Sequence, residues 1–188
     1  MKKIMWLFGQ PGSGRKTLIN NLLVGNQDII KQLGIDSTDI VYGEIPYVRS
    51  SFDSELFNDK RRYKVLSSIN SFSRADNDVL LLNGEFDDYC DIDNNVFDII
   101  RYEHTNITQE LLLLSTSDIN LLYERLQATD WFQSKYDEHN RRFTMDWLRF
   151  ASSYLKEKLL KYNEKGYTLY EIDTTDGYEV TKHLANHK

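Results

Sequence analysis

The residues with the clearest potential for chemistry lie near the start of the chain, in the segment GQPGSGRKT at residues 9–17. Glycines such as Gly9, Gly12 and Gly14 let a backbone curl so that successive N–H groups point inward at an anion, and Ser13 completes the turn. When a turn of this kind opens a helix, the helix N-terminus adds partial positive charge. The spacing of Gly9 and Gly14 is that of phosphate-binding loops, which predicts a cradle for the phosphates of ATP.

The cation and the hydroxyl that complete such a loop are displaced by one position. The usual pattern places Lys and then Ser or Thr directly after the second glycine. Here Arg15 and Lys16 follow Gly14, and Thr17 comes one place late. If the loop follows the usual pattern without an inserted residue, which we call the plain register, Arg15 takes the place of the lysine and neutralises the phosphates. A one-residue bulge would instead bring Lys16 and Thr17 into the usual roles. Arg15 and Lys16 are therefore both candidate catalytic cations, and Thr17 or Ser13 is the candidate ligand of Mg²⁺.

A strand and a helix are predicted on either side of this turn. Residues 3–8, KIMWLF, form a short apolar run of strand length that ends at the first glycine. Residues 15–24, RKTLINNLLV, place their apolar residues on one face of a helix. Strand, glycine turn and helix in this order form the context in which such a turn binds phosphate.

Strands and helices are predicted to alternate along the rest of the chain. Further strands are predicted within residues 39–48, 77–89, 109–118 and 167–177. Helices are predicted within residues 50–76, 119–129, 144–166 and 178–187, and residues 129–142 show little helical periodicity. This order predicts an α/β fold, a three-layer parallel sheet of about five strands with helices on both faces and ligands at the carboxyl ends of the strands.

Composition excludes several classes of protein. A length of 188 residues favours one domain, residues 1–188, with an inserted lid. The net charge of −6 argues against a protein that coats duplex DNA, although it leaves a local DNA contact open. The single cysteine, Cys90, excludes an intramolecular disulfide. Since no apolar run reaches the length of a signal peptide core or a membrane span, we expect a cytoplasmic protein without membrane contact.

Residues 6–23, WLFGQPGSGRKTLINNLL, resemble the P-loop kinases of the nucleoside, nucleotide and adenylylsulfate kinase group, with a variant Walker A loop. The order of the later segments is compatible with that group. The resemblance implies ATP and Mg²⁺ as cofactors and a mobile lid at residues 129–142. It also implies that the loop in YEIDTTD, residues 170–176, borders the adenine.

The resemblance further implies roles for individual residues outside the turn. Glu85, after the third strand, would act as a base or as a water-mediated partner of the metal. Arg141 and Arg142, which end the lid segment, would clamp the phosphates on closure. Arg125 and Lys135 are further candidates for that role, and Arg125 could equally be a surface residue on its helix. Glu44 and Arg49, after the second strand, would hold the acceptor.

The function that follows is ATP-dependent phosphoryl transfer to a nucleoside, a nucleotide or a related acceptor, including a modified base in DNA. An Asp-Gly-Asp marker after the second strand is missing, which argues against adenylylsulfate-like acceptors. The alternative is a nucleotide-binding interaction module without catalysis, which the order of Arg15 and Lys16 favours. The sequence does not identify the acceptor, and it is compatible with a homodimer.

Overall fold

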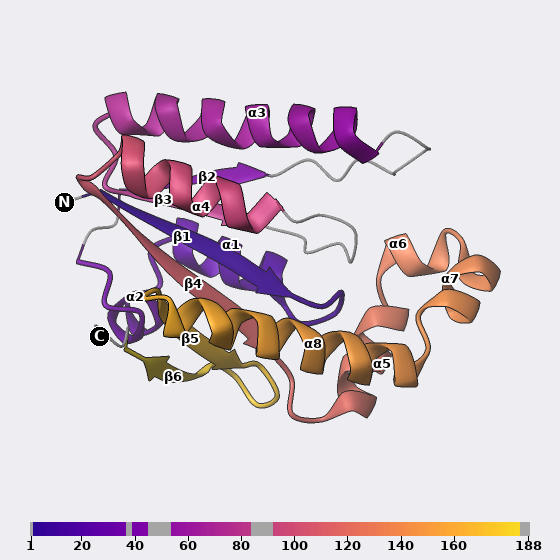
Figure 1. The fold of residues 1–188 in the computed structure, drawn as a ribbon. Helices are drawn as coiled ribbons and strands as arrows, with labels where there is room; N and C mark the ends of the chain where they lie inside the picture. The colour runs from indigo at the N-terminus through magenta and orange to yellow at the C-terminus, as the bar shows by residue number, and fades with distance from the viewer. Residues whose placement is uncertain (1, 37–38, 45–53, 84–91, 185–188) are drawn as a thin grey trace.

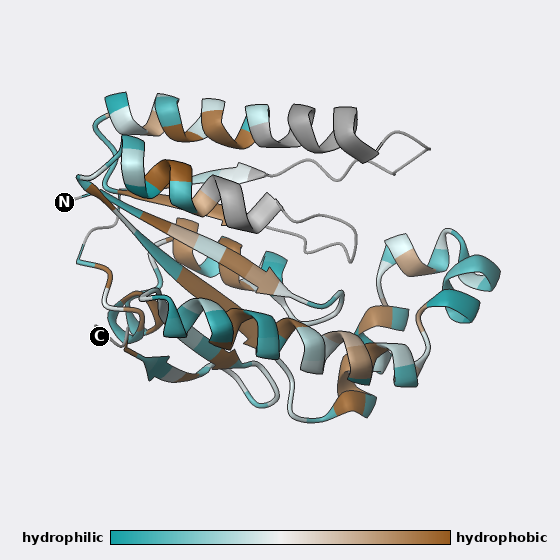
Figure 2. Ribbon diagram, viewed as in Figure 1, coloured by the Kyte–Doolittle hydropathy of each residue, from teal (hydrophilic) through white to brown (hydrophobic). Residues whose placement is uncertain are grey.

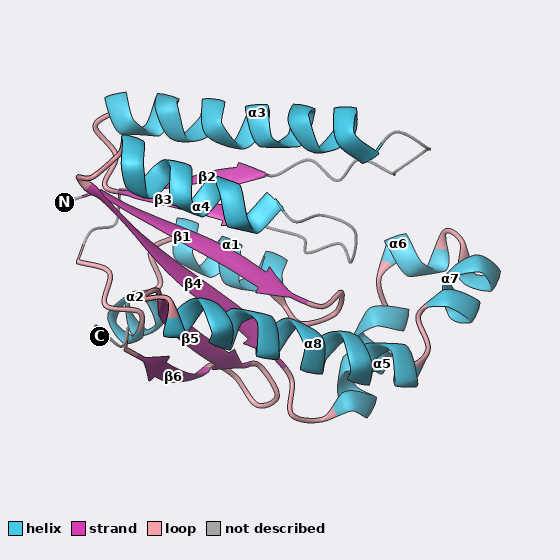
Figure 3. Cartoon of the chain, viewed as in Figure 1, coloured by secondary structure: helices cyan, strands magenta, loops and turns pink. Residues whose placement is uncertain are grey.

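The chain is organised around a mostly parallel β-sheet that lies between two layers of helices (Figure 1). The computed structural model describes residues 2–36, 39–44, 54–83 and 92–184. The elements of these residues, shown by type in Figure 3, are β1 (Lys2–Gly9), α1 (Arg15–Leu23), α2 (Gln27–Gln32), β2 (Ile40–Glu44), α3 (Ser54–Arg74), β3 (Val79–Asn83), α4 (Ile92–Glu103), β4 (Ile107–Ser115), α5 (Ile119–Gln127), α6 (Asp130–Gln133), α7 (Tyr136–Arg142), α8 (Met145–Glu164), β5 (Thr168–Asp173) and β6 (Glu179–His183).

The sheet of the described residues has six strands in the order β2-β3-β1-β4-β5-β6. The first five strands are parallel, and β6 runs antiparallel to β5. β1 takes a central position because its five consecutive residues Ile4–Phe8 are all buried, as a strand covered on both faces requires. The predicted parallel sheet of about five strands with helices on both faces is thus confirmed, and this architecture is consistent with a P-loop NTPase fold.

Successive side chains of the strands point to opposite faces of the sheet and pack into two separate cores. On one face, Ile4, Trp6 and Phe8 of β1 pack in a cluster that includes residues of α3, α4 and α8. On the other face, Met5 and Leu7 pack with residues of α1 and α2. Figure 2 shows the strands predominantly in apolar colours, whereas the exposed helical surfaces are largely polar. The two cores thereby fix the sheet between its two layers of helices.

The prediction of a C-terminal helix at residues 178–187 is wrong for the described part of this range. Glu179–His183 forms β6, which pairs with β5 from Leu169 opposite His183 to Asp173 opposite Glu179. Gly177, with φ 121°, turns the chain back on itself before this strand. Val180 packs partly buried against the core, and the free edge of β5 supplies the hydrogen-bonding partner that local periodicity does not reveal.

Residues 129–142 contain two short helices, α6 and α7, which their weak periodicity did not predict. The hydroxyl of Thr129 caps α6 by accepting a hydrogen bond from the N–H of Phe132 at 3.2 Å. The segment shares a small apolar cluster with α5 and α8, made of Leu122, Leu126, Phe132, Phe143 and Leu148. In Figure 1, α6 and α7 project beyond the carboxyl ends of the strands.

Two further helices, α2 and α4, had no counterpart in the sequence-based prediction. In the described part of the chain, none of the helices combines the length and the apolar character that a membrane span needs.

Candidate functional site

The glycine turn joins the carboxyl end of β1 to the first residue of α1. Gly12 and Gly14 both adopt left-handed backbone angles, with φ 86° and φ 87°. A Cβ atom at Gly12 would lie 2.8 Å from the carbonyl oxygen of Leu122, so α5 approaches the turn too closely for a side chain. A Cβ atom at Gly9 would likewise lie 2.9 Å from the carbonyl oxygen of Leu114 in β4. The glycines therefore serve both the curl of the turn and its close packing.

The start of α1 shows which register the chain adopts after Gly14. The N–H of Leu18 donates to the carbonyl of Gly14 at 3.0 Å, the ordinary bond of a first helical turn. Arg15 is the first helical residue, with no inserted residue between it and Gly14. The backbone thus follows the plain register, in which Arg15 stands at the position of the usual lysine and Lys16 at that of the usual hydroxyl.

A cleft of about 1170 Å³ opens over the turn. It runs along the carboxyl edge of the sheet, because its walls come from β2, β3, α5 and the segment after β5 as well as from the turn. Its described lining residues are Gln10, Pro11, Gly12, Gly14, Arg15, Lys16, Thr17, Ile19, Asn20, Asn21, Tyr42, Asn83, Arg125, Thr129, Trp131, Thr174, Gly177 and Tyr178. The structure thereby brings together most of the predicted phosphate-binding residues.

The charge of the cleft is opposite to that of the whole chain. The described lining residues include the three cations Arg15, Lys16 and Arg125, and no aspartate or glutamate. The chain as a whole has a net charge of −6. Concentrating positive charge at a helix N-terminus inside an acidic protein suits a strongly anionic ligand such as a polyphosphate.

The two cations after Gly14 differ in how they are held. Arg15 is partly buried, and its Nη1 donates to Oδ1 of Asn83 at 3.3 Å, which ties the start of α1 to the end of β3. Lys16 and Thr17 are exposed on the cleft. Both candidate cations thus reach the space above the turn, one with its direction set by a neighbouring strand.

Ser13 is separated from the other turn residues. Its side chain is only 1% exposed, and its Oγ has no hydrogen-bond partner among the described residues. It lines a second, smaller cavity of about 270 Å³ on the side of α8. Of the two candidate metal ligands, the one that faces the large cleft is Thr17.

The turn is braced from the far side by Thr174, a residue that the sequence analysis did not single out. Its side chain is 6% exposed, and its Oγ1 lies 3.1 Å from the carbonyl oxygens of both Ser13 and Ser115. Since a hydroxyl carries one proton, it donates to one of these carbonyls at a time. Thr174 thereby connects the turn to the ends of β4 and β5.

Arg125 completes this brace from α5. Its Nη1 donates to the carbonyl of Thr174 at 2.8 Å and its Nη2 to the carbonyl of Thr175 at 3.1 Å. The sequence left Arg125 open between a phosphate contact and a surface residue. The structure shows a partly buried guanidinium that anchors the segment after β5 and lines the cleft.

The carboxylate of Asp173 holds the segment after β5 through hydrogen bonds. Burial alone would raise the pKa of Asp173, but hydrogen bonds from Thr175 and Ser117 outweigh it and lower the pKa below its ordinary value. The N–H and the hydroxyl of Thr175 both donate to Oδ1 of Asp173, at 2.8 and 2.6 Å. The carboxylate therefore stays ionised and holds the loop beside the cleft in one conformation.

Several predicted site residues lie elsewhere or outside the described part. Arg141 and Arg142 end α7 on its exposed surface and are not among the described lining residues of the cleft. Arg49 and Glu85 lie outside the described residues, as does the side chain of Glu44. The backbone of Glu44 ends β2 in register with Asn83, next to the cleft.

The fit of a magnesium ion depends on the donor types at the cleft. Among the residues described, no group of three or more His, Cys, Asp or Glu side chains forms a metal cage. Mg²⁺ commonly keeps several waters and binds through substrate phosphates and one or two protein groups. The exposed hydroxyl of Thr17, beside a phosphate-type cradle, is compatible with this mode of binding.

Comparisons with known proteins add little to this geometry. No family model matches the chain, and no curated protein matches it. Among solved structures, APE1195 is 15% identical with a TM-score of 0.38, and the match covers 83% of this chain and 96% of that one. The YGR205w protein is 13% identical with a TM-score of 0.38, and the match covers 97% of this chain and 90% of that one. At these identities and TM-scores the two structures do not establish the fold, which follows from the sheet order and the turn described above.

Proposed function

We propose that this chain is a P-loop kinase. It transfers the terminal phosphoryl group of ATP to a nucleoside, a nucleotide or a related acceptor, and a modified base in DNA belongs to this class. The observation that supports this function best is the glycine turn that opens α1 on the floor of a cleft lined by Arg15, Lys16 and Arg125, without a described acidic side chain.

Phosphate binding in this proposal rests on the chain's own groups. The backbone N–H groups of Gly12 and Gly14 and the N-terminus of α1 bind the phosphate oxygens. Arg15, oriented by Asn83, and Lys16 neutralise the charge that develops during transfer. Bound with ATP, Mg²⁺ would neutralise further charge on the phosphates, and Thr17 is the residue that would hold it.

The transfer step forms one bond and breaks one. An acceptor oxygen attacks the terminal phosphorus, and the bond to the bridging oxygen breaks to release ADP. When the acceptor is a hydroxyl, its proton passes to a carboxylate, for which Glu85 remains the proposal. Glu44 and Arg49 remain proposed acceptor contacts, because β2 ends beside the cleft.

Arg141 and Arg142 can contact the phosphates only if the segment that carries them moves. Both are exposed on α7 and are not among the described lining residues of the cleft, so contact with phosphates requires α7 to approach the turn. We therefore propose residues 129–142 as a lid that closes over bound ATP and brings these cations to the phosphates.

A nucleotide-binding interaction module without turnover is the second candidate. One observation favours it: the plain register places Lys16 where working loops usually carry the metal-binding hydroxyl. Such a module would bind ATP through the same turn and transfer nothing.

The deciding experiment measures transfer of labelled terminal phosphate from ATP with Mg²⁺. The acceptors are nucleosides, nucleoside monophosphates, and DNA oligonucleotides with ordinary and hydroxymethylated bases. For a kinase, Arg15→Ala and Lys16→Ala should each lower transfer by a factor on the order of 100 or more. The exposed Lys31→Ala on α2, outside the described lining of the cleft, should leave it unchanged.

ATP binding is measured in parallel by calorimetry. Binding without transfer to any acceptor of the panel would favour the interaction module. Absence of ATP binding would overturn both candidates, since both require the turn to hold phosphates.

A further inference from the structure

The wall of the cleft carries an aromatic ring whose placement the proposed transfer does not explain. Trp131 of α6 lines the cleft and is 49% exposed, although tryptophan is usually largely buried. Its ring stacks on that of His139, with centroids 4.1 Å apart and an angle of 23° between the planes. One face of the indole is therefore covered from within the protein, while the same residue lines the cleft.

Packed side chains support this ring from behind. His139 is 4% exposed, and its Nδ1 lies 3.2 Å from the carbonyl oxygen of Phe132. Phe143 meets the edge of Trp131 at a centroid distance of 5.3 Å and an angle of 62°. Phe132 and Phe143 belong to the apolar cluster shared with α5 and α8. The indole is thus held in one orientation relative to its own segment, which limits the entropy that is lost when a ligand binds.

The cleft has room for a planar ligand beside the phosphates. Its volume of about 1170 Å³ exceeds the upper end of the roughly 300–1,000 Å³ of sites for one small molecule. Arg15 and Lys16 supply charge at its floor, and Trp131 supplies a flat apolar surface on its wall. A ligand that matches both combines phosphate with a flat heterocycle, which is the chemistry of a nucleotide.

We propose that Trp131 is the stacking surface for a nucleobase in this cleft. The base belongs either to ATP or to the acceptor, and both present the same π-face to the indole. The inference rests on the proposed function in that it assumes a nucleotide in the cleft. It adds a binding residue that neither the glycine turn nor the predicted lid arginines identify.

The test follows the fluorescence of the tryptophans during titration with adenosine, thymidine, short single-stranded oligonucleotides and, as a ligand without a base, tripolyphosphate. Trp6 is 3% exposed inside the core, and Trp147 packs against Phe143 at the start of α8. Trp131 should therefore dominate any quenching. Base-bearing ligands should quench the signal, tripolyphosphate should not, and Trp131→Phe should abolish the quenching.

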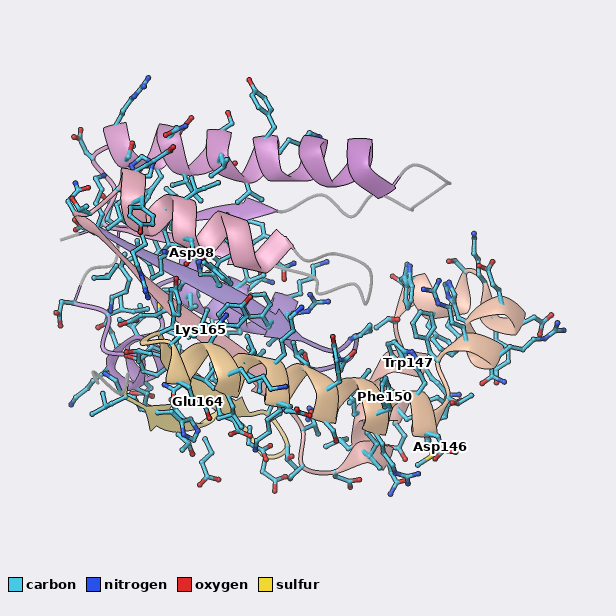
Figure 4. All side chains as sticks on the ribbon, in the orientation of Figure 1. Asp98, Asp146, Trp147, Phe150, Glu164 and Lys165 are labelled. Atoms are coloured by element: carbon cyan, nitrogen blue, oxygen red, sulfur yellow. The ribbon has the colours of Figure 1, made fainter. Side chains whose placement is uncertain are left out.

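Binding affinities of Trp131 variants distinguish stacking on a base from a merely structural role of this residue. Trp131→Ala should weaken binding of one base-bearing ligand roughly 5- to 150-fold, the range of base–aromatic stacking, while tripolyphosphate binds as before. Trp131→Phe should restore most of that affinity because it keeps an aromatic face. The control is Phe150→Ala on α8, an aromatic residue 63% exposed that lies outside the described lining of the cleft and is labelled with Trp147 in Figure 4.

The two sources of the base are distinguished in the transfer assay. A rise in KM for ATP alone in Trp131→Ala assigns the adenine to the indole, and a rise in KM for the acceptor alone assigns the acceptor's base. Wild-type affinity of Trp131→Ala for every base-bearing ligand overturns the proposal, as does an equal loss of tripolyphosphate binding. Quenching and affinity loss without any transfer would overturn the kinase function and leave the stacking site standing.

Discussion

The guanidinium of Arg125 donates to the carbonyl oxygen of Thr174 at 2.8 Å, across 49 residues of sequence. This bond joins α5 to the segment that follows the last parallel strand. Because Thr174 also contacts the carbonyl oxygen of Ser13, the same pair of residues braces the glycine turn from behind. The shape of the glycine turn therefore depends on contacts with residues far from it in the chain.

We expect Arg125→Ala to lower the free energy of unfolding by about 2 kcal/mol, since charge-assisted hydrogen bonds to two carbonyls are lost and both acceptors stay partly buried. Urea denaturation at neutral pH measures this change. Arg125→Lys should recover only part of it, because an ammonium cannot reproduce the two-pronged contact. The control is Arg149→Ala, an exposed arginine paired with Asp146, which should change stability by about 0.5 kcal/mol or less. Equal stability of the two alanine variants would contradict the brace.

Gly12→Ala should damage both stability and ATP binding. The new Cβ would lie 2.8 Å from the carbonyl oxygen of Leu122, and the φ of 86° adds backbone strain. We expect a loss of roughly 3 kcal/mol or more and no measurable ATP binding, because the turn must shift away from α5. Gly25→Ala is the matched control: its φ of 77° is similar, but nothing lies within 4 Å of its Cβ position.

For Gly25→Ala the expected loss is about 1 kcal/mol, from the left-handed backbone alone, with ATP binding retained. Calorimetry and urea denaturation on the two variants separate steric crowding from backbone strain. If Gly12→Ala were as mild as Gly25→Ala, the close approach of α5 to the turn would be refuted.

Asp173 should make the stability of the chain depend on acid pH. Its pKa is lowered in the folded state, so its hydrogen bonds stabilise the fold fully above the ordinary aspartate pKa of about 3.9 and are lost as pH falls through the folded value. Asp173→Asn should destabilise the protein by about 1 kcal/mol at pH 7, a figure reduced for its partial exposure to solvent. The difference from wild type should shrink below pH 4.

Urea denaturation at pH 7, 5 and 3 measures this trend. The exposed neighbour in the same loop, Asp176→Asn, serves as the control for loss of a charge without loss of the hydrogen bonds to Thr175. A gap between wild type and Asp173→Asn that stayed constant down to pH 3 would show that ionisation of Asp173 does not stabilise the loop.

The sequence by itself determined the parts of this protein that depend on neighbours in the chain. β1, the glycine turn and α1 follow from a buried apolar run, the spacing of Gly9 and Gly14, and a helical face of leucines, all within residues 2–23. β3 and β4 were predictable for the same reason, because an apolar run of strand length marks a strand covered on both faces.

The tertiary structure alone decided the relationships that depend on distant partners. β6 is a strand because the edge of β5 offers hydrogen bonds, although the local sequence suggested a helix. Ser13 turns into the smaller cavity and Trp131 reaches the wall of the large one, since packing of α5, α6 and α8 sets their directions. A residue's type limits the chemistry that it can perform, but the long-range contacts of the folded chain determine which site it faces.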